Sequence, residues 1–572
     1  MSPTADRHSR DPVATSTVSR MIGVVDAIVS ARGDKPRRGS RRTLHDTRFA
    51  AAAVGMALLL IAIGVEHYWL RDLKFDDAWI HFRYARNLAQ GKGFVYNDGE
   101  RVLGSGGIAW NLILAILARA TGPDALSGGV SLMNFVALVG CATILYRALR
   151  LLVPPWVGLT ITGSLLAQGP LLVCSIGGME TTLLCLLYFA TFLALLRERY
   201  VVAALAAGAA VCFRVESIAL LGATTLAAFL YRRGRFVLVL VTGSALPALA
   251  SLWAWMYFGS PIANSTIAKK IVYVVPPFTA VEVCFNALLA VFPFDQLVPL
   301  PQHPALTRWL GIVTWLVLIE LGYFFLRKRS PPASLIVLQV LGALAFYTVT
   351  NPHLFRWYTC TFVPLATLLA VLGMLAIVRT VPGLRTRPSG SLVVLLAAIS
   401  FLPLRATWWP FVPPDDARFS IRVPNARENA RTYQYASIAR WLNERSKPTD
   451  RVCISEIGAF GYHYRGPILD GLGLISPEVV PYHPVPDALR PNGLTGAIPP
   501  QVVRDFLPEF VVSLDVFAGA VFADPWFSEH YRLIGRWPWF GGPVRWRDVP
   551  PSVFGGREMR AYRRLDVPWL PR

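Results

Sequence analysis

The chain has 572 residues, 54% of them hydrophobic, and a formal net charge of +21 at pH 7. Its mean hydropathy of +0.45 is too high for an ordinary soluble domain and predicts a protein that crosses a membrane several times. The basic residues stand in short clusters between apolar runs, as in the cytoplasmic loops of membrane proteins, which argues against a nucleic-acid-binding protein.

Residues 1–48 are polar, basic and without periodicity, so they are predicted to form a disordered cytoplasmic tail. Residues 49–406 alternate apolar runs with short polar loops, and a helix needs about 20 residues to cross the hydrocarbon core. The sequence predicts about eleven spans, with the 14-residue segment 107–120 lying at the interface or re-entering the membrane. The predicted spans are 49–66, 127–146, 154–170, 179–196, 200–213, 216–231, 236–257, 308–326, 333–349, 357–378 and 391–406.

The positive-inside rule orients these spans. It places the N-terminus and the basic clusters inside, namely 146–150, 196–199, 231–235, 327–330 and 379–387. The same alternation places the loop 67–106 outside, with the polar motifs at 177–182, 213–217, 257–270 and 351–358. Ionisable groups at membrane depth usually line a shared polar cavity, so the sequence predicts one site that faces outward.

Residues 407–572 change character. The segment 426–445 has helical apolar spacing, whereas "RVCISEI" from residue 451 and "EFVVSL" at 509–514 have the composition of strands. This alternation predicts a small external α/β domain after an α-helical membrane domain.

The first external loop carries the most distinctive candidates. Asp76 and Asp77 directly precede "AWIHFRYARN", a predicted short helix with Arg83 and Arg86 at positions i and i+3. One carboxylate could accept a proton from a sugar hydroxyl, and the arginines could neutralise a phosphate. This combination suits transfer from a lipid-linked phosphate, and the alternative is a pair of solvated acids at a membrane exit.

The later polar motifs supply further candidates, each with a structural alternative. Glu180 could instead be a first-turn carboxylate favoured by the helix dipole. Arg214 and Glu216 interrupt an apolar stretch, either as a structural pair that closes a broken helix or as sugar-binding residues. Lys269 could be a solvated loop end, and Arg356 is a lone cation among aromatics where a phosphate or headgroup contact is expected.

The candidates form three sets. We predict Asp76 and Asp77 as catalytic, Arg83, Arg86, Arg214, Arg356 and Lys269 as donor-phosphate ligands, and Glu180, Glu216, Trp79, Tyr358 and His353 as sugar or acceptor contacts. No His, Cys and Asp cluster has metal-ligand spacing and no cofactor is predicted, although an aspartate pair would serve a divalent metal and a general base equally well.

The stretch "DDAWIHFRYARNLAQGKGFVYNDGERV", residues 76–102, resembles the first external loop of a group of GT-C superfamily glycosyltransferases. This group is typified by the terminal β-(1→2)-arabinofuranosyltransferases of cell-wall synthesis. Weaker similarities follow in "GGMETTL", "FRVES", "YFGSPIANSTIAK" and "ISEIGAFGYHYRGPILDGLGLISPEV". The chain departs from the group at "LGSGG" (103–107), where an acid, a glycine, an aromatic and an asparagine are usual, and at Val215, where a proline is usual.

The resemblance implies a polyprenyl-phosphate sugar donor, a cell-envelope glycan or glycolipid acceptor, and catalysis by Asp76 or Asp77 at the external face of a bacterial inner membrane. It also implies a pentofuranose such as arabinofuranose as the sugar. Two other hypotheses stay open. One is a glycolipid transporter or flippase with the carboxylates as proton relays, although no internal repeat of the transporter kind is found. The other is a non-catalytic glycolipid-binding scaffold.

Overall fold

A computed structural model describes residues 40–291, 303–380, 424–490, 496–538 and 558–569. The predicted span 391–406, residues 1–39 of the predicted tail and the first part of the predicted external domain, 407–423, lie outside these residues. The rest of the predicted disordered tail, 40–48, is instead helical and begins α2 (Ser40–Trp69).

The described part of the chain contains six helical segments long and apolar enough to cross a membrane. They are Thr47–Trp69 within α2 (Ser40–Trp69), α5 (Leu126–Leu149), Arg233–Phe258 with α11 (Phe236–Phe258), Ala305–Arg329 within α15 (Pro304–Arg329), Pro331–Thr350 with α16 (Pro331–Ser334) and α17 (Val337–Thr350), and α18 (Val363–Thr380). The prediction of a multi-pass α-helical membrane protein is confirmed.

A further span is bent. The predicted span 154–170 covers α6 (Pro155–Leu166) and only the first two residues of α7 (Gly169–Ile176). The two helices meet at 59° and are together long enough to cross. Pro170 stands in the first turn of α7, where its missing N–H costs nothing, but a proline there cannot continue the hydrogen-bond ladder of α6. The predicted straight span is therefore broken near its C-terminal end.

Shorter apolar helices lie between these spans. The predicted spans 179–196, 200–213 and 216–231 appear as α8 (Thr181–Leu196), α9 (Tyr200–Phe213) and α10 (Ile218–Tyr231), of 16, 14 and 14 residues. The segment 107–120 forms the equally short α4 (Ile108–Thr121), and α13 (Thr279–Val291) was not predicted. All five are shorter than the roughly 20 residues that a lone crossing needs.

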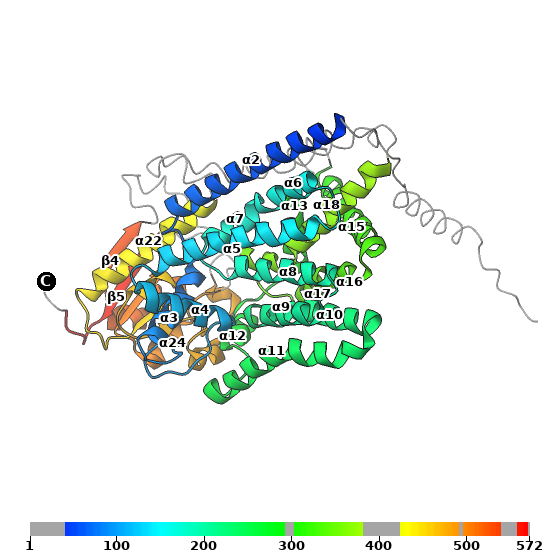
Figure 1. Ribbon diagram of the computed structural model, residues 1–572. Coiled ribbons are helices and arrows are strands. Elements are labelled where there is room, and N and C mark those ends of the chain that lie inside the picture. The colour runs from blue at the N-terminus through cyan, green and yellow to red at the C-terminus, as the bar shows by residue number, and fades with distance from the viewer. Residues whose placement is uncertain (1–39, 292–302, 381–423, 491–495, 539–557, 570–572) are drawn as a thin grey trace, which may run out of the picture.

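The bundle separates a protein-lined interior from lipid-facing edges. In α18, 78% of the apolar window is buried, whereas only 11% is buried in the spans of α2 and α11. Figure 1 shows α2 and α11 on opposite edges of the bundle. Small residues bring α9 and α11 close, because a Cβ on Gly208 would stand 2.0 Å from the carbonyl oxygen of Gly243.

The C-terminal residues form a compact α/β domain, as predicted. After α22 (Pro424–Asn443), a five-stranded sheet runs in the order β2-β1-β3-β5-β4. Its strands are β1 (Val452–Ile454), β2 (Ile468–Asp470), β3 (Phe510–Leu514), β4 (Tyr531–Pro538) and β5 (Glu558–Arg564). β1 is parallel to β2 and β3, and β5 is antiparallel to β3 and β4. Every residue of β1, β2 and β3 is buried, as expected for strands covered on both faces.

Two short helices join the bundle to this domain. α3 (Asp76–Ala89) is the predicted helix of the first loop, and α12 (Asn264–Val272) follows α11. Figure 1 shows α3, α4 and α12 at the end of the bundle where the C-terminal domain lies.

Candidate active site

Asp76 and Asp77 are the first two residues of α3, where the helix dipole favours carboxylates. Their side chains have different surroundings. Asp76 is 5% exposed and accepts hydrogen bonds from the N–H groups of Gly458 (3.1 Å) and Ala459 (2.9 Å), at the start of α23 (Ala459–His463). Burial raises the pKa of Asp76, against the opposing effects of Arg431 and the Ala459 N–H. Asp76 therefore links α3 to the C-terminal domain.

Arg83 and Arg86 continue this link. Arg83 is buried and donates to the carbonyl oxygens of Tyr96 (2.9 Å), Gly466 (3.0 Å) and Gly461. Arg86 donates to the carbonyl of Tyr462 (2.6 Å) and lies 4.7 Å from the centre of its ring. These arginines thus meet the carbonyl end of α23, whereas Asp76 meets its N–H end. Both arginines therefore have a folding contact with the C-terminal domain. The donors of Arg83 are taken up by three carbonyls and Asn97, whereas Arg86 uses only Nη1, so the predicted phosphate contact stays a prediction.

Asp77 lies on the open side of α3, with a quarter of its side chain exposed. Its carboxylate pairs with Lys269 Nζ at 3.4 Å, and this ammonium also lies 4.9 Å from the centre of the Phe355 ring. Burial opposes the charge on Lys269, but Tyr358 and Asp77 outweigh it and raise the pKa of the lysine.

The position of Lys269 is set by the start of its helix. Asn264 donates to the carbonyl oxygens of Gly473 (2.7 Å) and Leu474 (3.0 Å), and its own N–H donates to Leu103 (2.8 Å). α12 is therefore docked on both the first loop and the C-terminal domain. This docking explains how residues 192 positions apart in the chain form the Asp77–Lys269 pair.

A second ion pair joins Glu180 to Arg214, whose guanidinium lies 4.5 Å from the centre of the Tyr358 ring. Arg214 therefore pairs with Glu180, and not with Glu216 as in the structural alternative considered from the sequence. Glu216 is 6% exposed and instead accepts a hydrogen bond from Tyr347 (2.9 Å). The motifs at 177–182, 213–217 and 351–358 thus lie together in space, as expected from their predicted location on the same side of the membrane.

Aromatic side chains surround these charges. His353 stacks on Tyr273 with ring centres 5.1 Å apart, and Phe355 stacks on Trp357 at 4.9 Å. Arg356, in the same segment, is exposed. Trp79 is set apart from this group and packs against Tyr462 and His463 of the C-terminal domain, at 5.0 and 5.1 Å.

The fold is similar to that of ArnT from Cupriavidus metallidurans. The crystal structure of ArnT, bound to undecaprenyl phosphate, aligns with a TM-score of 0.50 and 12% sequence identity, covering 89% of this chain and 98% of ArnT. The predicted GT-C-like fold with an α/β C-terminal domain is thereby confirmed.

Two other comparisons involve Archaeoglobus fulgidus. The oligosaccharyltransferase AglB, in complex with an inhibitory peptide and a dolichol-phosphate, has a TM-score of 0.45 and 12% identity over 92% of this chain and 75% of AglB. The oligosaccharyltransferase in complex with Zn and sulfate has a TM-score of 0.49 and 14% sequence identity, over 84% of this chain and 71% of that protein. Residues 422–562 match a family model described as a domain of unknown function (DUF8728), and no curated protein matches.

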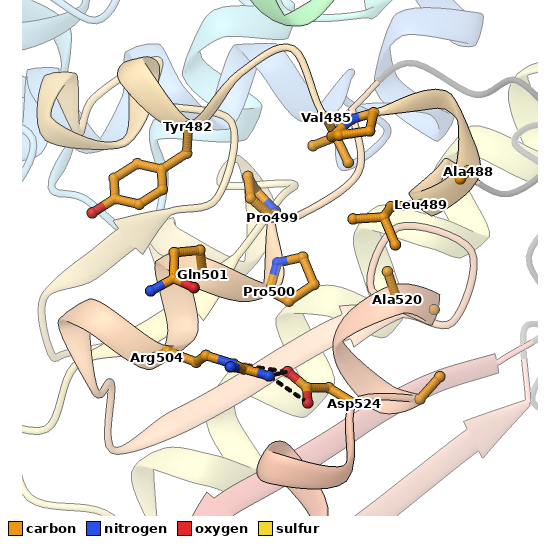
Figure 2. A pocket seen from close by; sticks show the side chains of 13 residues that line it. Tyr482, Val485, Ala488, Leu489, Pro499, Pro500, Gln501, Arg504, Ala520 and Asp524 are labelled. Carbon is orange, nitrogen blue, oxygen red and sulfur yellow. Dashed lines mark hydrogen bonds and ion pairs between the residues drawn. The ribbon is translucent and has the colours of Figure 1, made fainter.

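A hollow of about 740 Å³ in the C-terminal domain is a separate feature (Figure 2). It is lined mainly by prolines and small apolar residues, and the carboxylate of Asp524 is held there by Arg504 through contacts of 2.7 to 3.0 Å. Both oxygens of Asp524 are held by one guanidinium, whereas Asp77 makes a single, longer contact of 3.4 Å with an ammonium, so Asp77 is the better candidate base. Among the described residues, no three His, Cys, Asp or Glu side chains are grouped to hold a metal ion.

Sequence reasoning missed two polar residues at this end of the bundle. Lys74 is 1% exposed and donates to the carbonyl of Arg71 (2.6 Å) and to Ser131 Oγ (2.8 Å), and burial lowers its pKa to about 7. His81 stands one helical turn after Asp77 and bonds Asn111 Oδ1 through Nδ1 (2.9 Å). The i, i+4 spacing from Asp77 to His81 was the available signal, because such residues share a helix face.

Proposed function

We propose that this chain is a membrane glycosyltransferase that uses a polyprenyl-phosphate-linked sugar as donor. The observation that carries the proposal is the Asp77–Lys269 pair: a partly exposed carboxylate beside a cation, at the end of a membrane bundle. A base for a hydroxyl and a cation for a phosphate are the two charges that such a transfer needs. The donor class is also supported by the fold shared with ArnT, which was crystallised with undecaprenyl phosphate.

The chemistry assigns one role to each charge. The acceptor hydroxyl gives its proton to Asp77 as its oxygen forms a bond to the anomeric carbon of the donor sugar. The bond from that carbon to the phosphate oxygen breaks, and its electron pair leaves with the polyprenyl phosphate. Lys269 stabilises the charge that grows on this oxygen, and Arg356 holds the phosphate through its forked donors.

Glu180 and Arg214 shape the sugar side of the site. The Glu180–Arg214 pair and Tyr358 form a polar and aromatic wall. Stacked aromatic faces and paired charges suit a sugar ring, which offers both C–H faces and hydroxyl groups. From the resemblance of residues 76–102, we propose a pentofuranose such as arabinofuranose as the transferred sugar and a glycan or glycolipid of the bacterial cell envelope as acceptor. Transfer would then occur at the external face of the inner membrane.

The test uses the full chain in sealed lipid vesicles with radiolabelled polyprenyl-phosphate arabinofuranose and a membrane glycan fraction. The proposal predicts transfer of label to the glycan together with release of polyprenyl phosphate. Movement of intact donor across a sealed bilayer, without cleavage, would instead support a flippase. Saturable donor binding without transfer or movement, across a panel of polyprenyl-phosphate pentoses and hexoses, would support a scaffold.

A further inference from the structure

The His81 side chain belongs to a polar chain that the roles proposed above do not use. Its Nδ1 lies 2.9 Å from Asn111 Oδ1, and Asn111 Nδ2 donates to Ser105 Oγ at 2.7 Å. Because the amide nitrogen of Asn111 is directed to Ser105, its oxygen must accept from His81. This network assigns the proton of the neutral imidazole to Nδ1 and leaves a lone pair on Nε2.

The surroundings of His81 are those of the candidate site. Asp77 lies one turn earlier on the same helix face, and the charges that act on the imidazole are those of Glu180, Asp77 and Arg214. Burial lowers the pKa of His81, which keeps the ring neutral near pH 7. His81 remains 7% exposed, and no described residue makes a hydrogen bond to its Nε2.

The unusual "LGSGG" stretch supports this chain of side chains. Ser105 is the terminal acceptor, and the ring packs closely on Gly107, where a Cβ would stand 3.3 Å from His81 Cε1. Residues 103–107, where the chain departs from the family that it resembles, thus hold Asn111 and His81 in place.

We propose that His81 Nε2 accepts a hydrogen bond from a hydroxyl of the donor sugar, beside the catalytic Asp77. The inference rests on the proposed function and deepens it, because it says which part of the donor lies over α3. A hydroxyl group can donate to the Nε2 lone pair, whereas a fully ionised phosphate oxygen has no proton and would be repelled by it. The sugar therefore lies over His81, and the phosphate lies toward Lys269.

The test compares two substitutions that place a side-chain amide at different ring positions. In His81→Asn, the side-chain amide can still donate to Asn111, but nothing replaces Nε2. In His81→Gln, an amide oxygen can occupy the position of Nε2. We expect kcat/KM for polyprenyl-phosphate arabinofuranose to fall about 3- to 10-fold in His81→Asn, as for loss of one neutral hydrogen bond, and to be partly restored in His81→Gln.

Donors that lack single hydroxyls give the decisive readout. With 2-, 3- and 5-deoxy donors, one deoxygenation should lower kcat/KM in the wild type and have little further effect in His81→Asn, whereas the other two should cost the same in both. Equal costs of all three deoxygenations in both proteins would refute the contact while leaving the proposed function intact. A wild type that transfers sugar from no donor would refute both.

Discussion

The link between α3 and the C-terminal domain gives a sharp prediction for Arg83. This residue is 4% exposed, and its guanidinium spans carbonyl groups from the first loop and the C-terminal domain. Arg83→Lys keeps the charge but cannot hold these divergent acceptors with a single ammonium group. The substitution should loosen the domain from the bundle.

The size of the effect follows from the hydrogen bonds that a lysine cannot make. Arg83 makes three bonds to carbonyl oxygens and one to Asn97 Oδ1 at 3.3 Å. A lysine could keep one or two of them. Hydrogen bonds to charged groups contribute about 1.5–3 kcal/mol each, so losing two should cost about 3–6 kcal/mol. For a domain of this size the midpoint of thermal unfolding should fall by about 6 °C or more.

The assay is thermal unfolding in detergent, followed by limited proteolysis to detect release of the C-terminal domain. Arg119→Lys is the matched control, since Arg119 is exposed and makes one 3.3 Å bond to Ala89. The donor KM of the Arg83→Lys molecules that remain folded should be unchanged. An unchanged unfolding midpoint with a raised donor KM would show that Arg83 binds phosphate, and the folding role would be refuted.

Three further results are expected. Asp76→Asn keeps only one acceptor oxygen for the two N–H groups at the start of α23, so the protein should lose about 1–2 kcal/mol of stability. Each folded molecule should still transfer sugar within about 3-fold of the wild-type rate. Loss of transfer in the folded variant would show that Asp76 is catalytic. Arg356→Lys should raise the donor KM because the forked phosphate contact is lost, and an unaltered KM would remove this residue from the donor site. The topology is tested with single cysteines in a background where Cys212 is replaced by serine. Cysteines at the exposed positions 150 and 235 should react with a membrane-impermeant maleimide only in permeabilised cells, whereas a cysteine at the exposed position 449 should react in intact cells. The opposite pattern would show that the topology is inverted.

The architecture was readable from the sequence because it rests on composition and periodicity. Apolar runs and helix-to-strand alternation predicted the membrane bundle and the C-terminal sheet. The break between α6 and α7 was not foreseen, since residues 154–176 are apolar on both sides of Pro170. α13 was missed because its 13 residues are too few for a span and include Glu282.

The site was predictable as a set of motifs, but the partners within it were not. Two adjacent aspartates at a helix start look alike in sequence, and only the fold shows that Asp76 faces α23 while Asp77 faces Lys269. Arg83 resembles a phosphate ligand until Gly461, 378 positions later, is seen to supply a carbonyl to it. Such pairings depend on how the C-terminal domain docks, which local patterns do not encode.

The central claim is that Asp77 is the base of a sugar transfer from a lipid phosphate. Its direct test is the transfer rate from polyprenyl-phosphate arabinofuranose in Asp77→Asn, with Asp98→Asn as the matched control. Asp98 is a carboxylate of the same loop that pairs with Lys92 at 2.8 Å and is largely exposed. We predict a loss of about 10²–10⁴ in rate per folded molecule for Asp77→Asn, with only a small fall in unfolding temperature from the lost pair with Lys269, and a wild-type rate for Asp98→Asn. A wild-type rate in Asp77→Asn would contradict the account.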